Sequence, residues 1–189
     1  MELYLCHNKP TSHIGGFQFD SLEAIDLSMN ELHGSIPSSM FKLVNLRSLY
    51  LYSNNLSRVL ETSKFGKVRN LTDLDLSNNM LSWTTSGNSK SILPKIESID
   101  FSNNKVSGVW LWNMGNDTLW YLNLSYNSIS GFEMFPWKNI EILDLHCNLL
   151  QGPLPTTPPN STFFFFSFPK QIEWRNLTFD LQSEFHGSF

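Results

Sequence analysis

The sequence predicts a right-handed solenoid, in which similar coils stack to form a parallel β-sheet on the concave side and irregular or 3₁₀ segments on the convex side. The first observation is a periodic asparagine. It recurs at steps of 22, 24, 25, 25, 23 and 21 residues along the 189-residue chain, at Asn8, Asn30, Asn54, Asn79, Asn104, Asn127 and Asn148. The second observation is an apolar phrase that leads up to each asparagine from Asn30 onward. A period in this range is typical of repeats that each form one coil.

The apolar phrase has the pattern L-x-x-L-x-L-x-x-N-x-L and first reads Leu22, Ile25, Leu27, Asn30 and Leu32. It returns over residues 46–56, 71–81, 96–106, 119–129 and 140–150. Its L-x-L step alternates with period two, as a short strand does when its apolar side chains turn inward and its polar ones outward. Successive strands then lie side by side about 4.8 Å apart. The pattern therefore indicates a leucine-rich repeat solenoid, a mostly β member of the α/β superhelix class.

The asparagine stands where the chain leaves the strand and turns inside the stack. Backbone groups there lack a regular ladder partner, and a side-chain amide can both donate and accept hydrogen bonds. We therefore expect each of these side chains to satisfy buried backbone groups of its turn.

The repeats divide the chain into an array over residues 1–155 and a degenerate repeat tail over residues 156–189. The array begins with a broken repeat, Leu3, Leu5 and Asn8, and six repeats follow from about residue 22. The tail has no asparagine in phase. Within it, the run Phe163–Phe166 with Phe168 is too short to span a membrane and is expected to form a buried or aggregation-prone strand.

Bulk properties exclude several classes of protein. The net charge of −4 offers no basic surface for nucleic acid or for an anionic membrane. Met1–Pro10 lacks the basic start and apolar run of a signal peptide, and no stretch approaches the roughly 20 apolar residues of a membrane helix. Cys6 and Cys147 lie at opposite ends of the array, so we expect them to remain unpaired, because a disulfide needs Cα atoms within about 7 Å.

The outward positions of the strands form the candidate ligand-binding surface. A polar ladder with tyrosine anchors is suited to gripping a peptide or protein, and the candidates are Asp26, Tyr50, Tyr52, Asp75, Asp100, Tyr121, Tyr126, Asp144 and His146. The alternative for any single residue is that it belongs to the L-D-L-S consensus of the repeat and has no role in binding. For each residue taken by itself, this alternative is favoured. The surface as a whole remains the best candidate site.

Catalysis and metal binding are not expected. Asp75 and Asp100 should stand on adjacent strands, as a glycosidase pair or a calcium site would require. A catalytic pair also needs a cleft that raises one pKa, whereas an open sheet face should leave the carboxylates solvated and hydrogen-bonded to serines. His146 and Cys147 should point to opposite faces. We therefore expect no enzyme activity, no metal and no cofactor.

Sequons for N-glycosylation are frequent, which suits a secreted, glycosylated surface. They lie at Asn55, Asn70, Asn116, Asn123, Asn160 and Asn176. Asn123 should project from the middle of the concave sheet. A glycan there would displace a ligand toward the first repeats or toward the lateral flank.

Two repeats continue with a tighter ending, L-x-G-x-I/L-P, at Leu32, Gly34, Ile36 and Pro37 and again at Leu150, Gly152, Leu154 and Pro155. This ending resembles the plant-specific class of extracellular leucine-rich repeats. Over Val109–Phe165, segments such as Trp110–Gly115, Thr118–Asn127, Phe135–Lys138 and Leu143–Pro155 look like the middle of the ectodomain of plant receptor-like proteins of the disease-resistance type.

The resemblance implies a specific biological setting. Plant receptor-like proteins have an extracellular repeat array, one membrane helix and a short tail without a kinase. The chain would then bind a peptide or protein ligand and a co-receptor kinase at the extracellular face of the plasma membrane, and signal in defence or development. Because the family's signal peptide, cysteine-paired caps, island segment and membrane helix have no counterpart, we expect a partial ectodomain fragment. The alternatives are a secreted enzyme inhibitor of the polygalacturonase-inhibitor type and a truncated remnant without independent activity.

Overall fold

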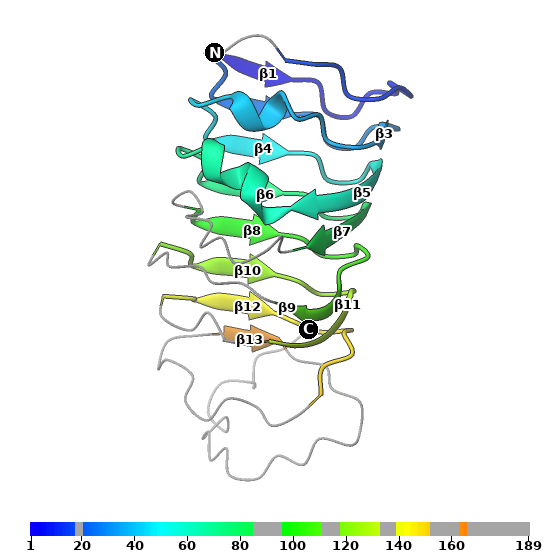
Figure 1. Ribbon diagram of the computed structural model, residues 1–189, viewed down its shortest axis with the longest axis vertical. Helices are drawn as coiled ribbons and strands as arrows, with labels where there is room; N and C mark the ends of the chain where they lie inside the picture. Colours follow the sequence, from blue (N-terminus) through cyan, green and yellow to red (C-terminus); the bar gives the residue numbers. More distant parts are fainter. Residues whose placement is uncertain (18–20, 85–95, 111–117, 133–138, 152–162, 166–189) are drawn as a thin grey trace, which may run out of the picture.

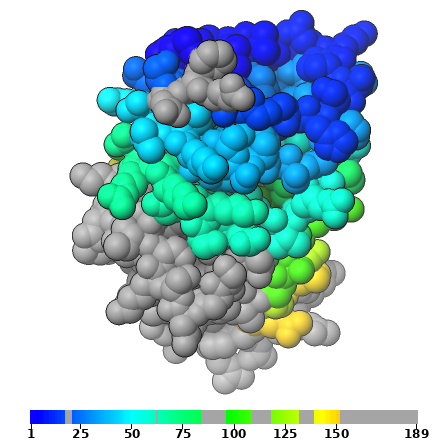
Figure 2. Space-filling model, turned by 45° about the horizontal axis from the view of Figure 1, so that its top comes forward, coloured from blue at the N-terminus to red at the C-terminus, as the bar shows by residue number. Residues whose placement is uncertain are grey.

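The computed structural model describes residues 1–17, 21–84, 96–110, 118–132, 139–151 and 163–165. Consecutive stretches of chain lie on one another as layers, seen as successive colour bands in Figure 2. Each layer adds one strand to a parallel main sheet that follows the order of the chain (Figure 1). Its strands are β1 (Glu2–Tyr4), β2 (Ala24–Asp26), β4 (Ser48–Tyr50), β6 (Asp73–Asp75), β8 (Ser98–Asp100), β10 (Tyr121–Asn123), β12 (Ile142–Asp144) and β13 (Phe163–Phe165). The predicted fold class is confirmed.

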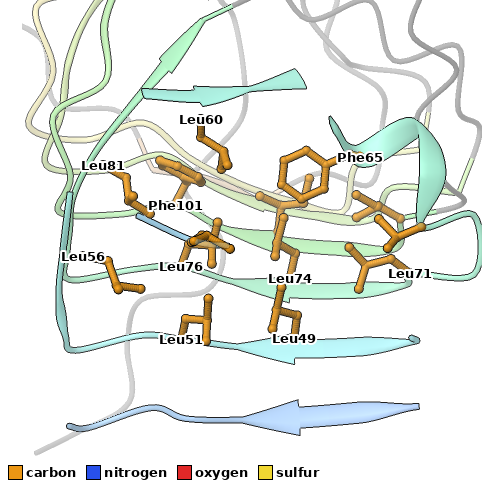
Figure 3. Packing of buried hydrophobic residues seen from close by; sticks show 14 of the residues in the cluster. Leu49, Leu51, Leu56, Leu60, Phe65, Leu71, Leu74, Leu76, Leu81 and Phe101 are labelled. Atoms are coloured by element: carbon orange, nitrogen blue, oxygen red, sulfur yellow. The ribbon is translucent and has the colours of Figure 1, made fainter. Parts of the chain in front are cut away.

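The core lies behind the main sheet and is built from the periodic apolar positions. In each of the six complete phrases, all four positions around the asparagine are buried, with 7% or less of the residue exposed. Leu49 and Leu51 on one coil stand beside Leu74 and Leu76 on the next (Figure 3). Inward side chains alternate with half-exposed ones along each central strand. The period of two read from the sequence therefore places leucine in the core, where removing its apolar surface from water drives folding.

The periodic asparagines join neighbouring coils as well as closing their own turns. The Asn79 amide nitrogen donates to the carbonyls of Leu76 and Ser77 at 3.1 and 3.0 Å in its own coil, and to that of Leu51 at 3.0 Å in the preceding coil. Its carbonyl oxygen accepts the Leu56 N–H at 3.0 Å. The same pattern of bonds recurs at Asn54, Asn104, Asn127 and Asn148. Asn30 makes the same donor bonds, but its oxygen accepts the Asn8 N–H, since Pro10 stands at the position of the usual donor and has no N–H. The predicted role in the turn is confirmed, and the link between coils is additional.

The residue before each asparagine adopts a positive φ. These left-handed residues are His7, Met29, Ser53, Asn78, Asn103, Tyr126 and Cys147, with φ between 49° and 60°. Their side chains share no chemical feature, and only two of them are asparagine, the type most at ease in this region. The turn geometry is therefore imposed by the coil around it.

In the described part of the chain, the opposite side of the coil contains two short 3₁₀ helices and two small sheets. The 3₁₀ helices are η1 (Met40–Lys42) and η2 (Thr62–Lys67), which agree with the expected convex side. The small parallel sheets, which the sequence reading did not foresee, contain β3 (His33–Gly34), β5 (Asn55–Glu61) and β7 (Met80–Thr84) in one, and β9 (Ser107–Trp110) and β11 (Ser128–Phe132) in the other. Both follow directly after the asparagine turns.

Aromatic side chains pack across the coils behind the main sheet. Phe41 in η1 meets Phe65 in η2 edge to face, with ring centroids 5.1 Å apart. Phe65 stacks on Trp83 at 5.8 Å, and Trp83 meets Phe101 edge to face at 5.2 Å. Figure 3 shows Phe65 across the core from the strand leucines. Such pairs add to the stabilisation from burial alone, so this row of rings ties four successive coils together.

The predicted strand in the tail is observed in part. β13 pairs in parallel with β12, and Phe164 is in register with Leu143. The remainder of the tail, with Phe166 and Phe168, lies outside the described residues, and the proposed boundary at residue 155 stays a prediction. Cys6 and Cys147 are free and exposed, as expected. Among the described residues, no helix has the length and hydropathy needed to cross a membrane.

Candidate binding face

The candidate site is the face of the main sheet that points away from the core, which we call the open face. Its central row follows the register of the strands and contains Asp26, Tyr50, Asp75, Asp100, Asn123 and Asp144. All of these residues are partly exposed. The structure therefore brings four predicted aspartates and Tyr50 together in one line across the sheet.

Two further rows flank the central one. Tyr121 belongs to the row at the start of the strands, with Ser48, Asp73 and Ser98. The row just beyond the strands contains Ser28, Tyr52, Ser77, Ser102, Ser125 and His146, which the backbone bonds of the following residues keep in step. Tyr126 lies outside all three rows, since it occupies one of the left-handed positions. Its exposed ring meets the His146 ring edge to face at 4.6 Å.

The aspartates of the central row have a structural role that explains the L-D-L-S consensus of the repeat. Asp75 Oδ1 accepts both the backbone N–H and the hydroxyl of Ser77, at 2.9 and 2.7 Å. Asp26 does the same for Ser28, and Asn123 for Ser125. These three serines are buried. Their hydroxyls therefore hold the turn and are not offered to a ligand.

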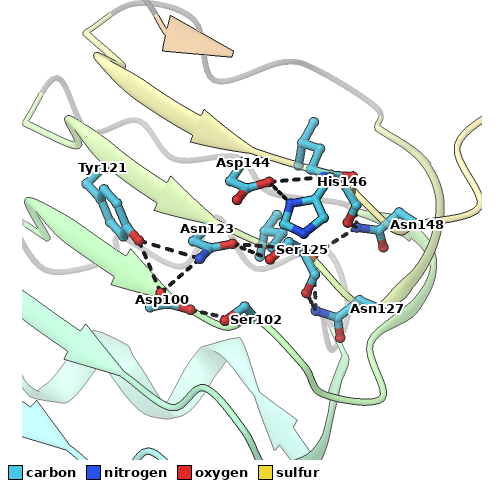
Figure 4. A network of polar contacts seen from close by, with 11 residues as sticks. Asp100, Ser102, Tyr121, Asn123, Ser125, Asn127, Asp144, His146 and Asn148 are labelled. Carbon is cyan, nitrogen blue, oxygen red and sulfur yellow. Dashed lines mark hydrogen bonds and ion pairs between the residues drawn. The ribbon is translucent and has the colours of Figure 1, made fainter. Parts of the chain in front are cut away.

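The second carboxylate oxygen, Oδ2, takes no part in the bonds that hold the turn. Among the described residues, Oδ2 of Asp26, Asp75 and Asp144 has no hydrogen-bond partner, whereas Asp100 Oδ2 accepts the Tyr121 hydroxyl at 3.1 Å and the Asn123 amide at 3.0 Å (Figure 4). The open face thus presents some carboxylate oxygens for an incoming donor and keeps others engaged internally.

Burial and neighbouring charge raise two pKa values on this face. The pKa of Asp75 is raised chiefly by burial, with a smaller contribution from the charges of Asp100 and Asp26, and against the hydrogen bonds from Ser77. Asp75 is therefore partly exposed but also partly desolvated, and the expected bonds to serine are present. Burial and then the Asp100 charge raise the pKa of Tyr121 to about 12, so its hydroxyl remains a donor.

The downstream end of the face contains a histidine and carboxylate pair. His146 Nδ1 lies 2.5 Å from Asp144 Oδ1, which also accepts the His146 backbone N–H at 3.1 Å (Figure 4). Because Asp144 orients the ring and Tyr126 packs against it, the histidine is held in one position. Cys147, which follows it, is exposed at a left-handed position rather than on the opposite face of a strand.

The charged residues in the main-sheet strands, within the described part of the chain, all have one sign. These strands carry Glu2, Asp26, Asp73, Asp75, Asp100 and Asp144, and none of them contains lysine or arginine. Sequence reasoning overlooked Glu2 and Asp73, although their place two residues before Tyr4 and Asp75 would have revealed them by the same period of two. Arg47 lies at the margin, with its Nε 3.9 Å from Glu23.

The sequons differ in how accessible their amides are. Asn55 and Asn70 are exposed. Asn123 lies in the central row, as predicted, but its amide nitrogen donates to Asp100 and its oxygen accepts from Ser125. Glycosylation of all six sites stays a prediction, and Asn116, Asn160 and Asn176 lie outside the described residues.

Comparison with known proteins identifies the repeats. A leucine rich repeat family model matches residues 1–56, and a second one matches residues 70–93. Together with the parallel main sheet and its asparagine turns, these matches define the chain as a leucine-rich repeat solenoid. No curated protein matches the sequence significantly.

Solved structures of similar fold include plant receptor ectodomains. The plant peptide hormone receptor RGFR1, in complex with RGF2, has a TM-score of 0.62 at 30% identity, covering 77% of this chain and 24% of that one. The ectodomain of the plant membrane receptor kinase GASSHO1/SCHENGEN3 from Arabidopsis thaliana, in complex with CASPARIAN STRIP INTEGRITY FACTOR 2, has 0.64 at 25%, covering 82% and 19%. That of the Arabidopsis thaliana receptor kinase SOBIR1 has 0.51 at 26%, covering 60% and 62%. The chain spans about a quarter or less of the first two.

Proposed function

We propose that this chain is the ligand-binding portion of the extracellular region of a plant receptor-like protein, and that a peptide or protein ligand lies on the open face. One observation carries the proposal: the strand register aligns partly exposed polar and tyrosine side chains in continuous rows across the sheet. A long row of this kind suits an extended partner, because successive residues of the partner meet successive coils. The receptor ectodomains that it resembles support the proposal.

The chemistry of the open face defines the ligand further. The Oδ2 atoms of Asp26, Asp75 and Asp144 are acceptors without an internal partner in the described part of the chain. Lysine and arginine side chains supply the matching donors and charge. Tyr50 and Tyr52 add amphipathic rings of the kind that anchors interfaces. The ligand is therefore an extended segment that bears basic residues.

The proposed setting follows from the same receptor class. The chain lies at the extracellular face of the plasma membrane and carries N-linked glycans. A co-receptor kinase completes the signal in defence or development, because the receptor-like class has no kinase of its own.

Binding to synthetic peptides tests the ligand proposal. The full chain is applied to an array of extended peptides that differ in their content of lysine and arginine, and the affinity of retained peptides is then measured. We expect basic peptides to be retained. Replacing Tyr50, Tyr52, Tyr121 or Tyr126 by alanine should weaken binding by about tenfold at one or more of these positions, which is typical of an aromatic anchor.

Charge variants provide a matched control for this experiment. Asp26→Asn removes a charge and retains the acceptor for Ser28, as Asn123 naturally does for Ser125, so it should lower affinity without disturbing the turn. Glu61→Gln, in the small sheet that contains β5, should leave the affinity for the peptide unchanged. Equal binding by all four tyrosine variants and by Asp26→Asn would contradict the assignment of the open face.

A further inference from the structure

A pocket of about 250 Å³ lies beside the small sheet that contains β3, β5 and β7, away from the open face. Three successive coils contribute to it. Its lining residues are Ser35, Ile36, Pro37 and Ser38 after β3, Ser57, Arg58, Val59 and Leu60 of β5, Lys64 of η2 and Leu81 of β7. Of the apolar members, Ile36, Leu60 and Leu81 are buried and form part of the core, whereas Val59 is exposed. The polar members among the described residues comprise two cations and three hydroxyls and include no carboxylate.

Arg58 stands at a position that two other coils give to glycine. Gly34, Arg58 and Gly108 each follow the last apolar residue of a phrase by two positions, and their φ angles are 83°, 101° and 80°. A side chain is strained at such an angle, whereas glycine is not. Arginine at this position is therefore conformationally unfavourable, and strain of this kind is typical of functional sites.

Packing does not explain the arginine either. Arg58 is exposed, and its guanidinium has no hydrogen bond or ion pair within the described residues. Lys64 Nζ lies 3.6 Å from Glu61 Oε1, and both of these side chains are more than a third exposed. Among the described residues, the two cations that line the pocket outnumber this single carboxylate, so their summed charge is positive.

Together these groups match one class of ligand. A guanidinium offers a rigid fork of N–H donors, an ammonium adds a mobile charge, and serine hydroxyls complete a shell around a compact anion. Phosphate and sulfate groups present several acceptor oxygens to such donors. We propose that the pocket lined by Arg58, Lys64, Ser35, Ser38 and Ser57 binds a tetrahedral oxyanion, a phosphate or sulfate group, either as the free ion or as a monoester.

The test uses the complete 189-residue chain and inorganic phosphate. The thermal midpoint and the heat of binding are measured as phosphate replaces chloride at constant ionic strength. Because phosphate also stabilises proteins non-specifically by exclusion from their surface, the expected signal is a saturable one. Methyl phosphate in a parallel titration distinguishes the sources: comparable binding indicates an esterified group, and binding restricted to inorganic phosphate indicates the free ion.

Arg58→Gly is the decisive variant because it separates folding from binding. Removal of the strained side chain should raise the thermal midpoint in the absence of phosphate, while the affinity for phosphate falls by about tenfold or more. Lys64→Gln should weaken phosphate binding, and Arg47→Gln, at the margin of the open face, should leave it unchanged. An undiminished saturable response in Arg58→Gly, or the absence of saturation in the wild-type chain, would overturn the proposal.

Discussion

Asp75 uses one carboxylate oxygen to hold its turn, while burial of the group opposes its negative charge. The two effects concern different parts of the same side chain. Oδ1 accepts from Ser77 in a geometry that an asparagine reproduces at Asn123. The charge itself is disfavoured by burial and by the neighbouring carboxylates of Asp100 and Asp26, which raise the pKa. The turn therefore needs the oxygen, but it does not need the charge.

Asp75→Asn should stabilise the fold at neutral pH. A carboxyl whose pKa is raised in the folded state contributes stability that is fully present below its unfolded pKa, near 3.9, and is lost as the pH rises through the folded value. The asparagine variant has no such loss. Urea denaturation from pH 3 to pH 8 should therefore show a gap between variant and wild type that opens as the pH rises above about 4 and then becomes constant.

Asp75→Ala provides the comparison, because alanine removes the charge and the acceptor together. It should be less stable than Asp75→Asn at every pH, by about 1 to 3 kcal/mol for the Ser77 donors left without a partner. If Asp75→Asn were less stable than the wild type at pH 7, the proposed penalty on the charge would be wrong.

At the scale of the element, each turn after a strand is held by one asparagine and bent by one left-handed residue. The asparagine was predictable because its amide supplies both a donor and an acceptor without charge, on a side chain short enough to reach the backbone of its own turn. The left-handed residue was not, since His7, Met29, Ser53 and Tyr126 have no common propensity for positive φ. Tertiary packing fixes their backbone, and the side chains then project wherever the turn directs them. Tyr126 consequently lies beside the rows rather than in one.

Asn104→Ala should reduce the free energy of unfolding by about 1 to 3 kcal/mol. The side chain donates to the carbonyls of Leu76, Phe101 and Ser102 and accepts the Leu81 N–H, so alanine leaves backbone groups of two coils unpaired. Chemical denaturation measures the change. Asn55→Ala is the matched control, because Asn55 is exposed on β5 and its substitution should shift stability by less than about 0.5 kcal/mol. Equal effects of the two substitutions would contradict the role of the turn amide.

At the scale of the whole molecule, stability is a sum over coils and the contacts between neighbours. Every main-sheet strand from β2 to β12 is hydrogen-bonded on both edges, whereas β1 has a partner on one edge in the described part of the chain. Leu5 in the first coil is 48% exposed, and Leu51 and Leu76 in the central coils are fully buried. The central coils should therefore open less often than the first.

Hydrogen exchange of backbone amides tests this gradient. The N–H groups of Leu5, Leu51 and Leu76 donate to the next strand over nearly equal distances of 2.8, 2.9 and 2.9 Å. Bond length therefore predicts similar protection of the three amides from exchange. The greater exposure of Leu5 and the single paired edge of its strand predict much faster exchange at Leu5. Comparable exchange rates at the three amides would show that the molecule opens as one cooperative unit, contrary to this expectation.

Most residues of the open face could be predicted from the sequence, and each residue that was missed has its own physical reason. A period of two placed Asp26, Tyr50, Asp100 and Asp144 in one row because side-chain direction in a strand depends on local backbone geometry alone. The same period would have found Asp73. Whether an outward carboxylate is solvated depends on the side chains of adjacent coils, so the burial of Asp75 could not be predicted from its own phrase.

By itself, the sequence determined the stacking of the coils, the apolar core and the identity of the side chain that closes each turn, because each of these depends on a pattern repeated within about 25 residues. Only the tertiary structure decided the two small sheets, the left-handed residues, the strained Arg58 and the pocket beside it. Those features arise where one coil meets the next, and the packing across that junction involves residues that are distant in the chain and follow no shared spacing.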